Sequence, residues 1–148
     1  MRVRPHHGSE KLGQPLGMYS HGFLSINNQR TLYVAGQLSA APDGSSVGAG
    51  DFDAQFRQVF HNFGAVLDAA GMTFDHVVKF TTYLTDPDRI SDFYRVRAEV
   101  FPALFTFKEP PPNTLLIVSR LVQPEFLIEV EGIAVIADNT AVITGVAE

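Results

Sequence analysis

The chain has 148 residues, of which 45% are hydrophobic and 18% are charged, and its formal net charge is −5. This composition is enough to fill the core of one domain, and the acidic balance argues against nucleic acid as the main partner. The absence of cysteine excludes disulfides, thiol catalysis and cysteine-based zinc sites. No apolar run approaches a membrane span, and the N-terminus has no signal-peptide core, so we expect a cytoplasmic protein with no membrane partner.

The N-terminal part of the chain divides into an arm and the start of a sheet. Residues 1–18 are polar and rich in Gly and Pro, which predicts a loosely held arm before a folded domain at 19–137. Tyr19–Ile26 and Thr31–Val34 are two β-prone runs separated by Asn27–Arg30, a segment suited to a tight hairpin. Two strands are therefore expected here, before a turn-rich loop at 40–50.

Two helices with a strand between them follow. Residues 51–70 carry apolar side chains at spacings of three and four, with Asp51 able to cap the start and Gly71 able to end the helix. His76–Leu84 alternates as a strand, with Val78, Phe80, Thr82 and Leu84 expected on one face. Asp86 before Pro87 then predicts the start of a second amphipathic helix that ends near Pro102.

The last elements complete a predicted ββαβαββ order. Leu115–Leu121 and Glu125–Ile136 are expected strands joined by a short turn at 122–124, and a tail at 138–148 contains an apolar run at 141–143 that suits an edge strand or a neighbour's surface. We expect an α+β fold with a mostly antiparallel sheet and two helices on one face. Residues 115–118 and 126–128 are apolar on both faces of their strands, so a second copy of the chain is expected to cover the other face of the sheet.

The acidic residues Glu129 and Glu131 lie on one face of an otherwise apolar strand. A buried charge there is costly unless it is paired, hydrogen-bonded or open to water. Two interpretations stay open, namely an edge position or ion pair with Arg120 on the adjacent strand, and an acid/base or ligand-orienting carboxylate in an interface cleft. Other polar residues that can reach such a cleft are Tyr19, Gln37, Tyr94, Asn113 and Arg120. The sequence has no metal-site pattern, no nucleophile elbow and no complete phosphate-binding loop.

Several motifs together resemble the YjgF/RidA (Rid, L-PSP) family. They are LGMYSHG at 16–22, YVAGQL at 33–38, LDAAGM at 67–72, VVKFTTYLTD at 77–86 and IEVEGIAVI at 128–136. The resemblance implies that 19–137 is a Rid-like domain with a chorismate-mutase-like fold, which assembles as a homotrimer with small-molecule clefts at the subunit interfaces. It also implies hydrolysis of reactive enamines or imines, such as 2-aminoacrylate, without a cofactor.

The resemblance also places the site residues and shows two departures. Glu129 matches the family's glutamate near the cleft, and Tyr19, Gly36 and Gln37 match its tyrosine and Gly-Gln pair. Asn113 stands where the deaminases have an arginine that holds the substrate carboxylate. Arg120 matches a second family arginine, but its odd separation from residue 113 puts it on the opposite face of an ideal strand. Tyr94 stands where many relatives have an asparagine.

The departures at Asn113 and Tyr94 make some of the functions that the resemblance implies more favoured than others. The leading hypothesis is a trimer that binds a small polar metabolite in its interface clefts, and that hydrolyses an imine, enamine or related C–N bond if it is an enzyme. The alternative is a non-catalytic metabolite-binding or regulatory module. The archetypal 2-iminobutanoate/2-iminopropanoate deaminase is disfavoured by Asn113, and an endoribonuclease is disfavoured by the acidic charge and the lack of a basic aromatic platform.

Overall fold

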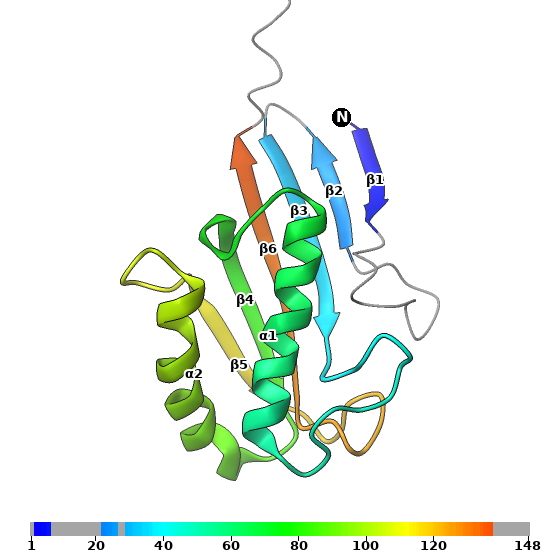
Figure 1. Ribbon diagram of the computed structural model, residues 1–148, viewed down its shortest axis with the longest axis vertical. Coiled ribbons are helices and arrows are strands. Elements are labelled where there is room, and N and C mark those ends of the chain that lie inside the picture. Colours follow the sequence, from blue (N-terminus) through cyan, green and yellow to red (C-terminus); the bar gives the residue numbers. More distant parts are fainter. Residues whose placement is uncertain (1, 7–21, 27–28, 138–148) are drawn as a thin grey trace, which may run out of the picture.

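The structure is a computed structural model that describes residues 2–6, 22–26 and 29–137. Its sheet has the strand order β1-β2-β3-β6-β4-β5, in which β4 and β5 are parallel and all other neighbours are antiparallel (Figure 1). The strands are β1 (Arg2–His6), β2 (Gly22–Ile26), β3 (Gln29–Gln37), β4 (Val77–Leu84), β5 (Asn113–Ile117) and β6 (Ile128–Ala137). The helices are α1 (Phe52–Ala69) and α2 (Ile90–Leu104), and short 3-10 turns at Phe74–His76 and Pro87–Arg89 precede β4 and α2.

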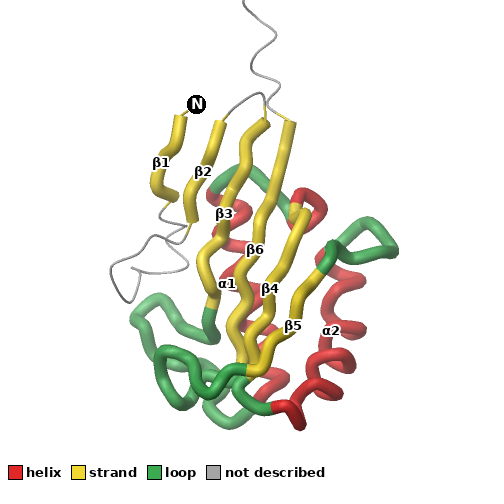
Figure 2. Tube along the Cα trace, turned by 180° about the vertical axis from the view of Figure 1, so that it is seen from behind, coloured by secondary structure: helices red, strands yellow, loops and turns green. Residues whose placement is uncertain are grey.

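Both helices lie on the same side of the sheet, and the view from behind shows the strands uncovered (Figures 1 and 2). The predicted α+β fold with two helices on one face is therefore confirmed. The predicted element order lacked β1, which lies within the expected arm and pairs with β2. The sequence of β1, Arg-Val-Arg-Pro-His, has no apolar alternation, and Pro is tolerated in a strand of this kind because it is at the sheet edge.

The helix α1 forms as its sequence predicts. The side chain of Asp51 accepts a hydrogen bond from the Ala54 backbone N–H at 3.0 Å, and Gly71 ends the helix with φ of +69°. The apolar stripe of α1 packs on the sheet through phenylalanine rings: Phe60 and Phe63 meet Phe80 of β4 edge-on, with centroids 5.7 and 5.2 Å apart. These aromatic contacts anchor α1 over the centre of the sheet.

A bulge at the start of β4 changes which of its side chains point to each face of the sheet. Val77 pairs with Ala134 and Lys79 with Ile133, so Val78 is an extra residue in the ladder. The predicted alternation is confirmed for Phe80, Thr82 and Leu84, which are buried toward the helices. It is wrong for Val78, which is exposed while its neighbour Val77 is buried, because the bulge shifts the alternation by one residue.

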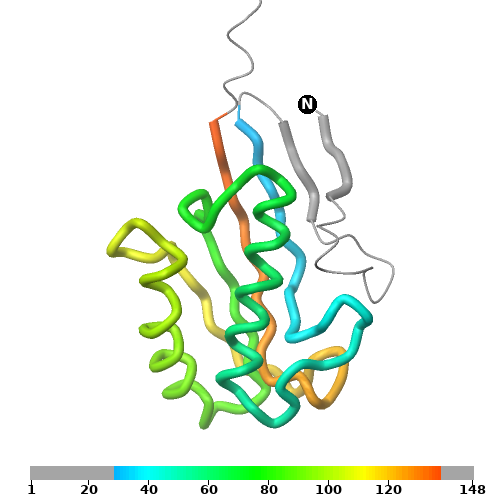
Figure 3. The backbone as a smooth tube through the Cα atoms, in the orientation of Figure 1, coloured from blue at the N-terminus to red at the C-terminus, as the bar shows by residue number. Residues whose placement is uncertain are grey.

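The predicted short turn between the last two strands is wrong. β5 ends at Ile117 and pairs with β4, and a longer loop at 118–127 leads to β6 on the other side of β4. Buried Gln55 of α1 holds this loop: its amide donates to the carbonyls of Glu125 (2.8 Å) and Gly48 (3.1 Å) and accepts from the Leu127 N–H (2.8 Å). The loops before α1 and before β6 thus meet at one end of the sheet (Figure 3).

Candidate functional site

Two carboxylates of β6 lie on the face of the sheet that the helices leave uncovered. Buried Ile128, Val130 and Gly132 alternate with half-buried Glu129 and Glu131, which confirms that the two acids share a face. On β4, beside β6, the Tyr83 hydroxyl donates to Glu131 Oε1 at 3.1 Å. We call this group, Tyr83, Glu129 and Glu131, the open-face acidic site.

Gly36 makes room for the Glu129 side chain. The register of β3 against β6 shifts between Val34 and Gln37, which marks a bulge or irregularity beside Glu129. A Cβ placed on Gly36 would lie 1.7 Å from Glu129 Oε1, closer than any side chain tolerates. Gly36 and Glu129, two separate candidate site residues of the sequence analysis, are therefore brought together, because a residue without a side chain is needed where the carboxyl lies.

The electrostatics of the open-face acidic site favour the protonated form of Glu129. Burial raises the pKa of Glu129 above its ordinary value, and the negative charge of Glu131 raises it further. The pKa of Tyr83 is raised by burial and by the hydrogen bond to Glu131. A carboxyl group whose pKa is moved toward neutrality is suited to both giving and taking a proton.

Arg120 does not neutralise Glu129. It lies in the loop after β5 rather than on an adjacent strand, and its guanidinium donates to the carbonyls of Leu121 and Val122, both at 3.1 Å. The interpretation of an ion pair with Arg120 on an adjacent strand is therefore wrong. The cause is the early end of β5 at Ile117, which moves Arg120 out of the sheet.

Asn113 and Glu129 are far apart within one copy of the chain. Asn113 pairs with Phe80 and faces the helical side, where it accepts a hydrogen bond from the buried Thr82 hydroxyl at 2.8 Å. Glu129 pairs with Tyr83 on the opposite face. Three residues along β4 and two strand spacings separate their backbones by roughly 14 Å. Within one copy of the chain, the two side chains therefore do not meet in one site.

Gln37 and Tyr94 lie on the helical side, on the face opposite Glu129. Gln37 is buried on the helical side, and its amide donates to the Ala35 carbonyl at 3.0 Å. Tyr94 is half exposed on α2, beside Arg97. Tyr19 lies outside the described residues. The sequence reasoning missed Arg97, although its spacing of three from Tyr94 and four from Phe93 and Phe101 is the spacing at which side chains meet on a helix.

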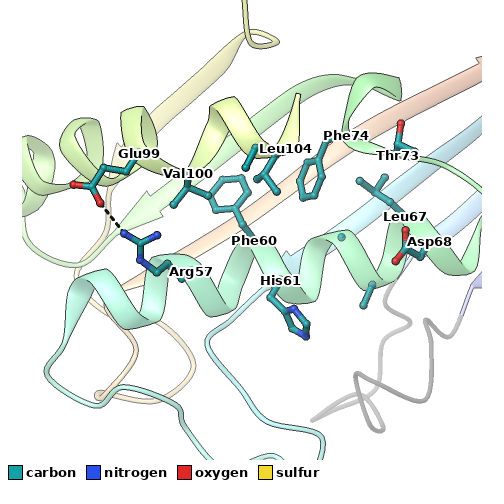
Figure 4. Close-up of a pocket in the computed structure, with 13 residues that line it drawn as sticks. Arg57, Phe60, His61, Leu67, Asp68, Thr73, Phe74, Glu99, Val100 and Leu104 are labelled. Atoms are coloured by element: carbon teal, nitrogen blue, oxygen red, sulfur yellow. Dashed lines mark hydrogen bonds and ion pairs between the residues drawn. The ribbon is translucent and has the colours of Figure 1, made fainter. Parts of the chain in front are cut away.

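On the helical side, described residues form a groove and a pocket. A groove of about 630 Å³ runs between α1 and α2, with an apolar floor that includes Phe60 and Phe74, and an ion pair of 2.6 Å between Arg57 and Glu99 at one end (Figure 4). None of the predicted site residues lines it. A pocket of about 500 Å³ lies along α2 and contains Tyr94.

Within the described part of the chain, no three His, Cys, Asp or Glu side chains lie close enough together to hold a metal ion. Among the same residues, neither helix combines the length and apolarity that crossing a membrane requires.

The fold is α+β with a chorismate-mutase-like arrangement, and comparison with known proteins gives its family. Residues 10–136 match the family described as Endoribonuclease L-PSP. A RutC family protein of Pyrococcus horikoshii is 35% identical over 126 residues, which are 85% of this chain and 93% of that protein. The chain belongs to the Endoribonuclease L-PSP family, also called YjgF/RidA/RutC, and the resemblance stated from the sequence motifs is confirmed.

Two further relatives are informative. The crystal structure of RidA from the Antarctic bacterium Psychrobacter sp. PAMC 21119 has a TM-score of 0.73 at 31% identity and covers 90% of this chain and 100% of its own. A 2-iminobutanoate/2-iminopropanoate deaminase of Homo sapiens is 34% identical over 95 residues, 64% of each chain. The chorismate-mutase-like fold class is thus confirmed by both structure and relatives.

Proposed function

We propose that this protein is a homotrimer that binds a small polar metabolite in clefts between its subunits and hydrolyses an imine, enamine or related C–N bond there. The observation that carries the proposal is the Glu129 carboxyl, which lies against Gly36 on the uncovered sheet face with a raised pKa. A side chain of this kind is expected at a site of proton transfer rather than on an ordinary solvated strand.

The uncovered sheet face supports the assembly. Tyr33 is 51% exposed and Leu116 is 43% exposed, and half-buried Ile133 and Val135 lie on the same face of β6. An apolar sheet face of this extent is a liability in a monomer, and packing against a second copy removes it. In such an assembly, Asn113 of one copy can approach Glu129 of another, which the distance between them within one copy does not allow.

Hydrolysis needs only groups that the open-face acidic site supplies. In its acid form, Glu129 can protonate the imine nitrogen, and in its carboxylate form it can take a proton from the attacking water. Water adds to the carbon of the C=N bond, and the tetrahedral adduct then breaks its C–N bond to give a carbonyl compound and ammonia. No redox step occurs: the imine nitrogen keeps its own hydrogen and gains two protons from the water, whose oxygen becomes the carbonyl oxygen.

Asn113 shapes which substrate fits. An amide donates and accepts single hydrogen bonds but carries no charge, so it cannot replace an arginine that binds a carboxylate through two charge-assisted bonds. The substrate is therefore not required to be a carboxylate, and the 2-imino acids of the human relative are expected to be poor substrates.

Turnover by Glu129→Gln tests the catalytic role. We expect ammonia release from a panel of imines and enamines to fall at least about a hundredfold relative to wild type, while Glu125→Gln, a matched exchange in the loop before β6, stays active. Unchanged turnover in Glu129→Gln would remove Glu129 from the mechanism. Ligand-dependent stabilisation across a metabolite panel without any turnover would favour the alternative, a metabolite-binding module.

A further inference from the structure

Arg97 is unusual among the arginines of the helical side because it has no carboxylate partner within residues 29–137. Arg57, Arg89 and Arg95 each form an ion pair of 3.0 Å or less with an acidic side chain. The guanidinium of Arg97 instead lies over aromatic rings, 4.8 Å from the centroid of Tyr94 and further from two others, Phe93 and Phe101. Stacking fixes the plane of the guanidinium and leaves its N–H donors without a protein acceptor in the described chain.

The pocket of about 500 Å³ along α2 places a second cation near Arg97. It is formed between α2 and the segment 105–110, and Lys108 of that segment lines it together with Arg97. None of the residues that line it carries a carboxylate. Tyr94 and Phe107, which are 51% and 64% exposed, give it aromatic walls. We call this hollow the α2 pocket; its volume is within the range of small-molecule sites.

The segment that carries Lys108 is anchored to the domain. The backbone N–H and the hydroxyl of Thr106 donate to the two carboxylate oxygens of Asp75, at 2.9 and 2.6 Å. Phe105 is buried and packs on Phe101 and Phe74, with centroids 5.0 and 5.6 Å apart. These contacts at residues 105 and 106 fix the base of the segment, two residues before Lys108, which lines the pocket.

We propose that the α2 pocket binds an aryl phosphate monoester, an anion with a flat aromatic body and a phosphate group that carries two negative charges. Two cations without an opposing carboxylate suit a dianion, and a guanidinium held flat on rings presents its edge for two parallel bonds to phosphate oxygens. The exposed rings of Tyr94 and Phe107 suit a flat apolar or aromatic body. The groove between the helices offers no such match, because its Arg57 is already paired with Glu99.

The α2 pocket is separate from the open-face acidic site. It lies on the helical side of the sheet, whereas Glu129 lies on the uncovered side, and neither Glu129 nor Asn113 lines it. The proposal therefore does not rest on the proposed hydrolysis, and the two can fail independently. The pocket is an additional ligand site, with Arg97 and Lys108 as its anion-binding residues.

Titration of the full-length protein with phenyl phosphate, followed by calorimetry, tests the proposal. We expect saturable binding with a dissociation constant below about 1 mM. Benzoate, which has one charge, and inorganic phosphate, which has no ring, are each expected to bind at least about tenfold more weakly. Equal affinity for all three anions would overturn the assignment of an aryl phosphate, because neither the ring nor the second charge would then contribute to binding.

Variants locate the binding. Arg97→Gln should weaken phenyl phosphate binding about tenfold or more, and Lys108→Gln about threefold or more. Arg95→Gln removes the same charge from the same helix but from an arginine paired with Asp53, so its affinity should equal that of wild type. Lys108 is exposed, so its variant will fold even if Arg97→Gln does not. Absence of saturable binding, or an equal loss in Arg95→Gln and Lys108→Gln, would show that the pocket is not the site.

Discussion

The Glu129 carboxyl occupies the space that a side chain on Gly36 would take, since a Cβ there would lie 1.7 Å from Oε1. The backbone of Gly36 is not in the left-handed region, and the group that an added Cβ would displace is the end of the flexible Glu129 side chain. We therefore expect Gly36→Ala to cost less than about 1 kcal/mol of folding free energy. The carboxyl must move, so the raised pKa of Glu129, followed by carbon NMR of its carboxyl, should shift.

Gly132 provides a control for this first prediction. A Cβ at Gly132 would lie 2.7 Å from the Lys79 carbonyl oxygen and 2.8 Å from the buried Phe63 ring, neither of which can rotate away. Gly132→Ala should therefore destabilise the fold by about 1–3 kcal/mol. Equal losses of stability in the two glycine variants would contradict the view that only a mobile carboxyl opposes a side chain at Gly36.

The raised pKa of Glu129 predicts how Glu129→Gln changes stability with pH. In the unfolded chain this carboxyl titrates near its ordinary value of 4.5, and in the folded chain it holds its proton to a higher pH. The folded state thus loses stability as the pH rises from 4.5 through the raised pKa. Glu129→Gln should raise the melting temperature at pH 7.5 relative to wild type, and this gain should shrink at pH 4.

Replacing Asp75 should change the melting temperature at pH 7.5 in the direction opposite to Glu129→Gln. Hydrogen bonds from Thr106 lower its pKa below the ordinary 3.8, so its charged form stabilises the fold above that pH. Asp75→Asn should therefore lower the melting temperature at pH 7.5, with the difference lost as the pH falls through the lowered pKa. A melting-temperature difference for Glu129→Gln that does not depend on pH would contradict the assigned pKa shift.

Gln55 should be among the costliest polar side chains to remove. Its fully buried amide satisfies two carbonyls and one N–H in the loops before α1 and β6. Gln55→Leu leaves those backbone groups without partners and should cost about 2–4 kcal/mol in urea unfolding. Gln58→Leu is the control, since half-buried Gln58 bonds only the Asn62 side chain and should cost less than about 1 kcal/mol.

Local sequence patterns predict some features of this fold and miss others. The helix α1 and the shared face of Glu129 and Glu131 follow from local periodicity, and the structure confirms them. The bulge at Val78 and the early end of β5 depend on contacts between strands distant in sequence, so no local pattern contains them. The predicted position of Arg120 was wrong because the expected strand was extended over residues that belong to the loop after β5.

The uncovered sheet face predicts that Leu116→Lys will weaken self-association. Leu116 is 43% exposed on β5 and lies beside Tyr83 on the face opposite the helices. Burying the charge of a lysine in an interface is costly, so the dissociation constant of the assembly should rise at least about tenfold. Sedimentation measures this constant, with an assembly of three 16.2 kDa chains as the reference. Ala69→Lys, on the exposed helical side, should leave assembly unchanged. A wild-type protein that is monomeric at micromolar concentration would contradict the proposed trimer.

Asn113 predicts the outcome of restoring a family arginine. Wild type should release ammonia from freshly generated 2-aminoacrylate much more slowly than an arginine-bearing relative, because a bidentate contact to the substrate carboxylate is absent, and such a contact is worth roughly two decades in binding. Asn113→Arg should recover part of that rate and lower KM more than it raises kcat. Asn113→Gln lengthens the side chain by one methylene group but adds no charge, so it should recover none of the rate. The Thr82 hydroxyl loses its acceptor in Asn113→Arg, so a thermal melt is needed to separate lost folding from lost chemistry. If wild type already matches the relative, the carboxylate is held by another residue, and the argument from Asn113 fails.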